Sequence, residues 1–295
     1  MLNTEYKSSL ILVMTTILAA FGWIFSKEAI QGLPPFGFIG LRFILASLCL
    51  LPLCYKSMVK ARLKDITSAA MVGCLLAGAI MNWIYAISIS DTLGEGAFIV
   101  SLSMLIVPLV GWLLFKERPQ RAFWLSLPVA MIGLAFLSLS GSWQQSSSQF
   151  FFIGCATMLA LHFNVNRKYA QKLPVLLLTT IQLFTVGCLV SLFSLITEDF
   201  PAVIEPSIWV WFALSVVLAT SLRYVMQTLG QKGAAAGTAA LIMILEPVWT
   251  VILSILWYGE QLSTGKLIGC GFILLALVLY RTQGRLFKGF TLRHR

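Results

Sequence analysis

Residues 27–43 read KEAIQGLPPFGFIGLRF, and residues 167–183 read RKYAQKLPVLLLTTIQL. The two stretches share a basic residue, a Leu-Pro step and an apolar continuation, and Pro34 aligns with Pro174 at an offset of 140. Further along, LVGWLLFKERPQ resembles VILSILWYGEQL, and Glu117 aligns with Glu260 at an offset of 143. These shared basic, proline and glutamate positions predict a duplicated chain, with one unit over 1–145 and a second over 146–295.

The composition places both units in a membrane. Hydrophobic residues make up 59% of the 295 residues and charged residues 11%, and the mean hydropathy is +0.90. Soluble domains carry about 45–50% apolar and about 25% charged residues. Disordered chains need low hydrophobicity and high net charge. Both classes are therefore excluded.

A membrane-spanning helix needs about 20 mostly apolar residues, and the sequence offers ten such segments. They are too long and too evenly apolar for barrel strands. The first is too long for a signal peptide, and we predict that it is retained. The predicted spans are 8–28, 36–55, 66–89, 93–115, 122–140, 149–166, 174–196, 207–230, 235–258 and 264–281.

Five helices per unit is an odd number, so the second unit must enter the membrane upside down relative to the first. The predicted fold is an all-α integral membrane protein with two inverted five-helix repeats. Such repeats are typical of alternating-access transporters, whose substrate site lies near the midplane between the halves.

The orientation follows from the 21 Lys and Arg residues. With the N-terminus inside, all but four fall in inner segments; Lys27 and Lys266 fall outside, and Arg42 and Arg223 lie within spans. The positive-inside rule therefore predicts a multi-pass protein of the bacterial cytoplasmic membrane with both termini in the cytoplasm. The formal charge of +10 then faces anionic lipids rather than nucleic acid.

Three stretches resemble the ten-helix EamA family of the drug/metabolite transporter superfamily. They are LRFILA at 41–46, VPLVGWLLFKERP at 107–119 and LEPVWTVILSILWYGEQLSTGKLIGCGFILLALVLY at 245–280. The halves differ where Ser103-Met104 stands opposite Glu246-Pro247, and where Gln182 stands opposite Arg42. The resemblance implies a secondary transporter that exports small metabolites, often amino acids or amphipathic amines. The alternatives are a proton-coupled multidrug or organic-cation exporter, and a channel-like facilitator or scaffold receptor.

Two charges are expected at membrane depth, where a charge costs about 2.5–3.5 kcal/mol on insertion scales. Glu246 is the deeper, and Arg223 lies in the preceding span. We predict that Glu246 carries a proton or holds a substrate ammonium group, with Arg223 beside it. The structural alternatives are a simple ion pair, or an Arg223 side chain that snorkels to the surface. Arg42 is close enough to the outer surface to snorkel as well.

Two prolines are predicted to break helices next to the site. Pro247 cannot donate to the carbonyl of Met243, and Pro108 cannot donate to that of Met104. Backbone carbonyls left unpaired at an interrupted helix are common in the substrate sites of transporters. The alternative is a kink that serves only packing.

The remaining candidates are polar and aromatic residues at similar depths. Aromatic rings can stack on planar or cationic substrates, although each ring can equally be a packing residue or an interfacial anchor. His162 is either a packing histidine or a proton relay. The candidate substrate-binding set comprises Trp23, Asn82, Trp83, Tyr85, Ser103, His162, Asn164, Arg223, Tyr224, Gln227 and Glu246.

No enzyme, cofactor or metal site is predicted. HExxH, GxSxG, P-loop and GxGxxG patterns have no usable context, and the two histidines are His162 and His294. The six cysteines form no CxxC pair, and we interpret them as packing residues. The partners are then a small-molecule substrate, lipids and, through Glu246, protons. Gly265 and Gly269 are a weak dimer candidate, so the expected state is a monomer or weak dimer.

Overall fold

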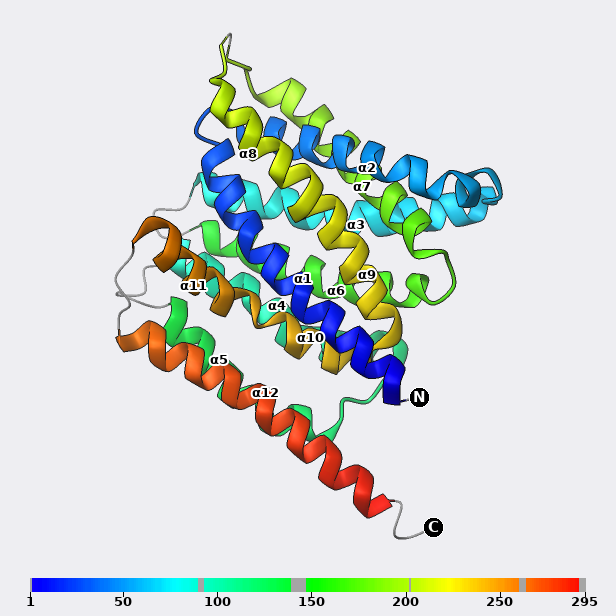
Figure 1. Cartoon of the computed structure of the whole chain (residues 1–295), viewed down its shortest axis with the longest axis vertical. Coiled ribbons are helices and arrows are strands. Elements are labelled where there is room, and N and C mark those ends of the chain that lie inside the picture. The colour runs from blue at the N-terminus through cyan, green and yellow to red at the C-terminus, as the bar shows by residue number, and fades with distance from the viewer. Residues whose placement is uncertain (1, 90–92, 139–146, 202, 260–263, 292–295) are drawn as a thin grey trace.

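The computed structural model describes residues 2–89, 93–138, 147–201, 203–259 and 264–291, which are helical apart from short connections (Figure 1). Helices α8, η1 and α9 form one continuous path, and α10 and α11 form another, so the described residues contain ten helical segments at the ten predicted positions. The bounds are α1 Leu2–Ala29, α2 Pro35–Val59, α3 Leu63–Ser88, α4 Leu93–Phe115, α5 Arg121–Ser138, α6 Ser148–Ala170, α7 Val175–Thr197, α8 Pro206–Val216, the π-helix η1 Val217–Leu222, α9 Arg223–Gly233, α10 Ala236–Met243, α11 Glu246–Tyr258 and α12 Thr264–Thr291.

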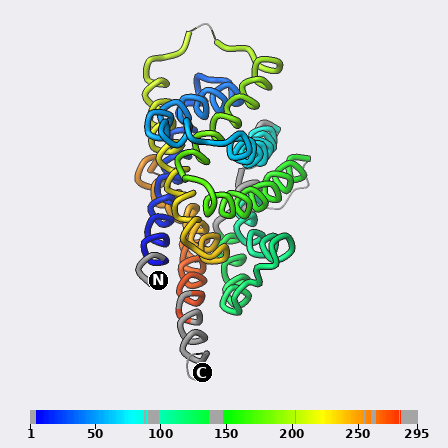
Figure 2. The backbone as a smooth tube through the Cα atoms, turned by 90° about the vertical axis from the view of Figure 1, so that its right-hand side faces the viewer, coloured from blue at the N-terminus to red at the C-terminus, as the bar shows by residue number. Residues whose placement is uncertain are grey.

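Seven of the described segments are long and apolar enough to cross a membrane, judged by length and composition. Three shorter apolar stretches, Ile99–Phe115, Arg121–Phe136 and Thr264–Tyr280, occupy the other three positions. The start of α1 and the end of α12 lie toward the same end of the molecule (Figures 1 and 2). An even number of antiparallel helical segments has this consequence.

The helix contacts repeat when the two halves are exchanged. Helix α2 packs along its counterpart α7, and α5 packs along its counterpart α12. Helix α3 packs on α6, and the equivalent helices α9 and α1 pack on each other. Helix α4 packs on α6, as α10 and α11 pack on α1. The duplicated sequence therefore builds a duplicated set of contacts between the halves.

Glycines allow the counterpart helices to approach closely. A Cβ atom on Gly187 of α7 would lie 2.6 Å from the backbone nitrogen of Ile44 in α2. A Cβ atom on Gly133 of α5 would lie 2.9 Å from the carbonyl oxygen of Gly269 in α12. Gly269, which the sequence suggested as part of a weak dimer contact, thus packs against another helix of its own chain.

The end of α7 caps the start of α2. The Glu198 carboxylate accepts hydrogen bonds from the backbone N–H groups of Phe36 (2.9 Å) and Gly37 (2.8 Å), and from the Ser194 hydroxyl (2.8 Å). Pro34 occupies the N-cap position of α2 and has no side chain that can cap the helix. Glu198 therefore satisfies N–H groups that α2 cannot satisfy itself, and its charge suits the positive end of the helix dipole.

Replacing Glu198→Ala should lower the free energy of unfolding by about 1 kcal/mol and the unfolding midpoint by about 2 °C, because two N–H groups lose their acceptor. Thermal unfolding of the purified protein in detergent measures the change. Glu205→Ala is the matched control, because the exposed Glu205 carboxylate accepts a hydrogen bond from Ser207, two residues away. Equal midpoints for the two variants would refute the cap.

Candidate functional site

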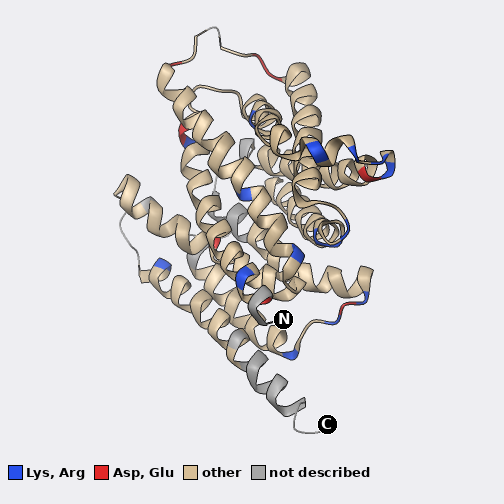
Figure 3. Ribbon diagram, turned by 45° about the vertical axis from the view of Figure 1, so that its right-hand side comes forward, with Lys and Arg blue, Asp and Glu red and all other residues tan. Residues whose placement is uncertain are grey.

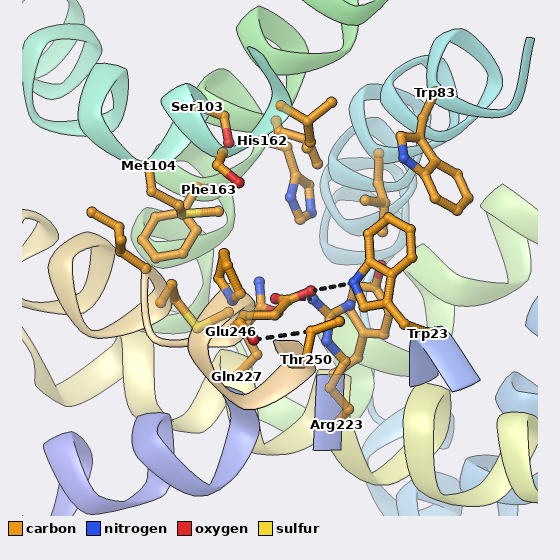
Figure 4. Close-up of a pocket in the computed structure, with 18 of the residues that line it drawn as sticks. Trp23, Trp83, Ser103, Met104, His162, Phe163, Arg223, Gln227, Glu246 and Thr250 are labelled. Atoms are coloured by element: carbon orange, nitrogen blue, oxygen red, sulfur yellow. Dashed lines mark hydrogen bonds and ion pairs between the residues drawn. The ribbon is translucent and has the colours of Figure 1, made fainter. Parts of the chain in front are cut away.

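A cavity of about 300 Å³ lies between the two halves of the chain (Figure 4). Helices α1, α3 and α4 of the first half and α6, α9, α10 and α11 of the second contribute to its wall. Most of the wall is apolar, with a few polar groups. The lining residues are Trp23, Leu76, Trp83, Val100, Ser101, Ser103, Met104, Leu159, His162, Phe163, Arg223, Tyr224, Gln227, Met243, Ile244, Glu246, Pro247, Thr250 and Val251.

The Glu246 carboxylate is the charged centre of the cavity. The Trp23 indole nitrogen donates a hydrogen bond to Oε1 of Glu246 over 3.1 Å, and Arg223 Nη2 lies 3.8 Å from Oε2. The Arg223 guanidinium also lies 4.7 Å from the centre of the Tyr224 ring. Because a charge at this depth is costly without partners, one carboxylate holds α1, α9 and α11 together at the cavity.

Glu246 lies where a helix is interrupted. Helix α10 ends at Met243, Ile244 and Leu245 form a turn, and α11 begins at Glu246 with Pro247 in its first turn. Proline is well tolerated there, because the first N–H groups of a helix have no partner within it. The start of α11 also places the positive end of its dipole beside the Glu246 carboxylate.

The second predicted break is wrong. Helix α4 runs from Leu93 through Pro108 to Phe115 without interruption. The Asn164 side chain of α6 donates hydrogen bonds to the carbonyl oxygens of Val107 (2.8 Å) and Ala160 (2.9 Å). This bridge holds α4 against α6 at the proline, so the loss of one backbone hydrogen bond does not end the helix.

Further polar groups surround the charged pair. His162 Nε2 lies 3.1 Å from Oε1 of Gln182, and both side chains are buried. Arg223 Nε and Gln227 Oε1 are buried and have no hydrogen-bond partner among the described residues. The cavity thus presents a carboxylate, a guanidinium, an imidazole and an amide inside a mostly apolar wall. Such a site can hold a small molecule that carries both polar and apolar groups.

Most of the predicted site residues lie together in this cavity. The lining set includes Trp23, Trp83, Ser103, His162, Arg223, Tyr224, Gln227, Glu246 and Pro247.

Three predicted residues lie elsewhere. Asn82 donates to the Gly78 carbonyl oxygen of its own helix (2.8 Å), and the Tyr85 ring packs edge-on against Phe151 (4.7 Å between centroids). Asn164 joins α6 to α4. Depth in the membrane was the signal used for these residues, but each residue turns a helix by about 100°, so equal depth does not mean the same face.

Sequence reasoning missed the apolar part of the wall, such as Leu76, Met104 and Leu159. These residues carry no signal in a chain that is apolar throughout. Trp23 contacts Trp83 edge-on across α1 and α3, with 5.5 Å between ring centroids. Trp23 lines the cavity and is 39% exposed.

A polar cluster closes the bundle at the end where α1 begins. Arg167 Nη1 lies 2.8 Å from Glu117 Oε2, and Lys168 pairs with the other oxygen of Glu117. Arg167 also donates to the Ala234 carbonyl oxygen over 2.9 Å. This cluster joins the α4–α5 connection, α6 and the α9–α10 connection.

A buried amide pair lies beside the cluster. Asn166 of α6 donates to Oε1 of Gln231 in α9 over 2.6 Å, and both side chains are buried. Nearby, a Cβ atom on Gly230 would lie 2.6 Å from Cγ of Leu12 in α1, so α9 ends tightly packed on the start of α1. The cavity is therefore separated from this end of the molecule by paired polar groups and close packing.

Comparison with known proteins agrees with this architecture. The profile of the EamA-like transporter family matches twice, over residues 7–139 and 146–282. The chain belongs to the EamA-like transporter family. It is therefore a multi-pass integral membrane transporter with duplicated halves, and not an enzyme. The family resemblance read from the sequence is confirmed.

Several transporters are similar to this chain along most of their length. The uncharacterized transporter YvbV of Bacillus subtilis is 25% identical over 292 residues, covering 96% of this chain and 94% of that protein. An uncharacterized transporter of Archaeoglobus fulgidus is 23% identical over 253 residues, covering 86% and 79% of the two chains. The uncharacterized transporter PA0485 of Pseudomonas aeruginosa is 28% identical over 217 residues, covering 72% and 70%. A protein of known crystal structure superposes with a TM-score of 0.82 at 16% identity, over 96% of this chain and 99% of that one, and so shares the fold.

The Glu117 cluster should make stability depend on pH. Partial burial opposes ionisation of Glu117, but the hydrogen bond from Lys168 and the charges of Arg167 and Lys168 outweigh it and lower the pKa of the Glu117 carboxyl from its usual 4.5. A carboxyl whose pKa falls on folding stabilises the protein above its unfolded-state pKa, and that contribution disappears as the pH falls through the lower folded-state value.

We therefore expect Glu117→Gln to lower the unfolding midpoint at about pH 7 and to lower it less at about pH 3, because the wild-type carboxyl is increasingly protonated as the pH falls. Thermal unfolding at the two pH values measures the difference, and Glu205→Gln is the control for a surface carboxylate. A loss of the same size at both pH values would show that the cluster does not act through ionised Glu117.

Proposed function

We propose that this cavity is the substrate site of a secondary transporter that moves amino acids or amphipathic amines across the bacterial cytoplasmic membrane by alternating access, in the direction of export. The observation that carries the proposal is the Glu246–Arg223 pair, which faces a cavity lined by both halves. A volume of about 300 Å³ is at the small end of ligand pockets.

A zwitterion suits this pair. An ammonium group would replace Arg223 as the partner of Glu246, and a carboxylate would take Arg223 as its own partner. The gap of 3.8 Å between Arg223 Nη2 and Glu246 Oε2 is longer than a charge-assisted hydrogen bond, so the two groups are open to other partners. The apolar wall would hold the side chain of such a substrate, and Trp23 and Trp83 offer ring faces and edges to it.

Charge placement supports an orientation with both termini in the cytoplasm. A cluster of Lys and Arg residues lies on the right of the bundle in Figure 3, around the α2–α3 turn, and further ones lie near the N-terminus at the middle of the view. The positive-inside rule assigns that side to the cytoplasm. Trp23, which lies nearer the end of α1 than its start, would then line the external side of the cavity. The odd number of helices per half and the exchange symmetry of the contacts support an inverted repeat.

Counterflow in proteoliposomes tests the transport proposal. Vesicles preloaded with a candidate solute should take up its labelled form transiently and saturably, whereas a channel-like facilitator would show no counterflow. Candidate solutes come from a thermal-shift panel of amino acids, amines and aromatic metabolites. A ligand at about 100 times its Kd adds about 2.7 kcal/mol of stability. If no solute of these classes shifts the midpoint or shows counterflow, the substrate assignment fails.

Glu246→Gln should lower transport of the best solute about tenfold or more, because the loss of one charge-assisted contact costs about 1.5–3 kcal/mol. Initial rates of counterflow measure the loss, with Glu205→Gln as a control of the same chemistry on the surface. A Glu246→Gln protein that transports at the wild-type rate would remove Glu246 from the site.

Proton-coupled export of an organic cation is the second candidate, favoured by one observation. Glu246 is the one acidic residue among the described residues that line the cavity. If it exchanges a proton for the substrate, a pH gradient should drive uptake of a labelled amine into wild-type vesicles. Glu246→Gln vesicles should lose this response. Uptake that ignores the gradient in the wild type would leave facilitated transport of a zwitterion as the better assignment.

A further inference from the structure

Arg42 of α2 does not snorkel to the surface as the sequence suggested. It is 8% exposed, and its guanidinium lies between α1 and the π-helix η1. Nη1 donates to the Ser26 hydroxyl of α1 over 2.8 Å, Nε donates to the Thr220 hydroxyl, and Nη2 donates to the Ala219 carbonyl oxygen over 3.3 Å. None of the ion pairs found among the described residues involves Arg42. A buried charge held only by neutral groups is costly, which calls for a role beyond packing.

The segment that Arg42 contacts is itself unusual. Val217–Leu222 forms a π-helix between α8 and α9. Inside it, the Thr220 hydroxyl donates to the Ser215 carbonyl oxygen and the Ser221 hydroxyl to that of Val216, each over 2.9 Å and five residues back. π-helices are rare, and they occur mostly as single turns at functional sites. Arg42 therefore binds both a hydroxyl and a carbonyl of this wide turn.

The extra residue of the π-helix sets the direction of Arg223, which lines the cavity together with Tyr224. In an unbroken α-helix three turns take about 10.8 residues, so residues 11 apart share a face. Arg223 follows Phe212 by 11 residues, and it would therefore share the face of Phe212. Instead Tyr224 joins Phe212 and Val216 in one apolar cluster, where its ring packs on Phe43 of α2. The π-helix shifts the helical register by one residue, so the Arg223 side chain leaves the face of Phe212 and lines the cavity.

We propose that Arg42 is a positioning residue: it holds η1 in its π-helical form, and this turn directs Arg223 into the cavity, where it binds an anionic group of the substrate. The second half of this statement rests on the proposed function. The first half concerns the direction of one side chain and can be tested without any substrate.

The placement is tested by chemical labelling. Arg223→Cys is introduced into a protein whose six native cysteines have been replaced, and its rate of reaction with a small cationic methanethiosulfonate reagent is measured. Adding Thr220→Val removes the acceptor of Arg42 Nε at nearly constant side-chain volume, and Arg42→Lys removes the planar guanidinium but keeps the charge. We expect labelling to slow about tenfold in each case, because reactivity falls when a thiol turns from an open cavity into packed surroundings.

The control lies on the same helix. The Ser47 hydroxyl is buried in α2 and donates to the Ile44 carbonyl oxygen within that helix. Ser47→Ala should leave the labelling rate unchanged. If Thr220→Val and Arg42→Lys proteins label at the control rate, the inference is overturned. Should Arg42→Lys not fold, Thr220→Val decides the result.

The functional consequence is tested with phenylalanine and phenethylamine, which differ by the carboxyl group. If Arg223 binds that group, Arg42→Lys and Thr220→Val should weaken phenylalanine binding about tenfold relative to phenethylamine binding, as expected for the loss of one charge-assisted contact. A general loss of stability would weaken both ligands together and would contradict a positioning role.

The two proposals can fail separately. In an Arg223→Met background, Arg42→Lys should cause no further loss of phenylalanine affinity, because both changes remove the same contact. If the losses from the two substitutions add, Arg42 does not act on the substrate through Arg223. If the wild-type protein binds neither probe but the Arg223→Cys variants are labelled at the expected rates, the proposed substrate is overturned. The role of Arg42 in directing residue 223 is then retained.

Discussion

The Glu246 carboxylate is the constraint on which the rest of the site depends. A charge inside an apolar bundle must find partners on other helices, and here they are the Trp23 indole of α1 and the Arg223 guanidinium of α9. These contacts need α1, α9 and α11 at one point, and they need a helix that begins where the carboxylate lies. Pro247 and the turn at Ile244 and Leu245 meet the second requirement. The interruption of the α10–α11 path and the charge at its centre are therefore one feature.

Duplication explains where the cavity lies but not its chemistry. Exchange of the halves reproduces the helix contacts, so the cavity is enclosed by equivalent elements of both units. Its two charges nevertheless come from the second unit, and the first unit contributes Trp23, Trp83 and Ser103. Opposite the buried Arg42 of α2 stands Gln182 of α7, which contacts His162 rather than a π-helix. The two units therefore line the cavity with unlike groups.

Polar contacts hold both ends of the bundle. At the end where α1 begins, the Glu117 cluster and the Asn166–Gln231 pair join α6 to its neighbours. At the other end, the Tyr258 hydroxyl of α11 donates to Glu28 of α1 over 2.7 Å, and Glu198 at the end of α7 caps α2. Under alternating access, the polar contacts at the first end would have to separate for the cavity to open there.

The sequence alone determined the class, the positions of the ten helical segments, the duplication and the family, because these depend on composition, apolar length and spacing along the chain. It also pointed to Glu246, Arg223 and the break at Pro247, since charges and prolines are rare enough in such a chain to stand out. Only the tertiary structure decided which residues at one depth share a cavity: Trp83 lines it, whereas Asn82 does not. The π-helix and the direction of Arg42 were also decided there. The face on which a helical residue lies depends on every residue before it in the helix. One extra residue in a turn therefore redirects all the side chains that follow. The local pattern of apolar residues in the sequence does not reveal such a turn.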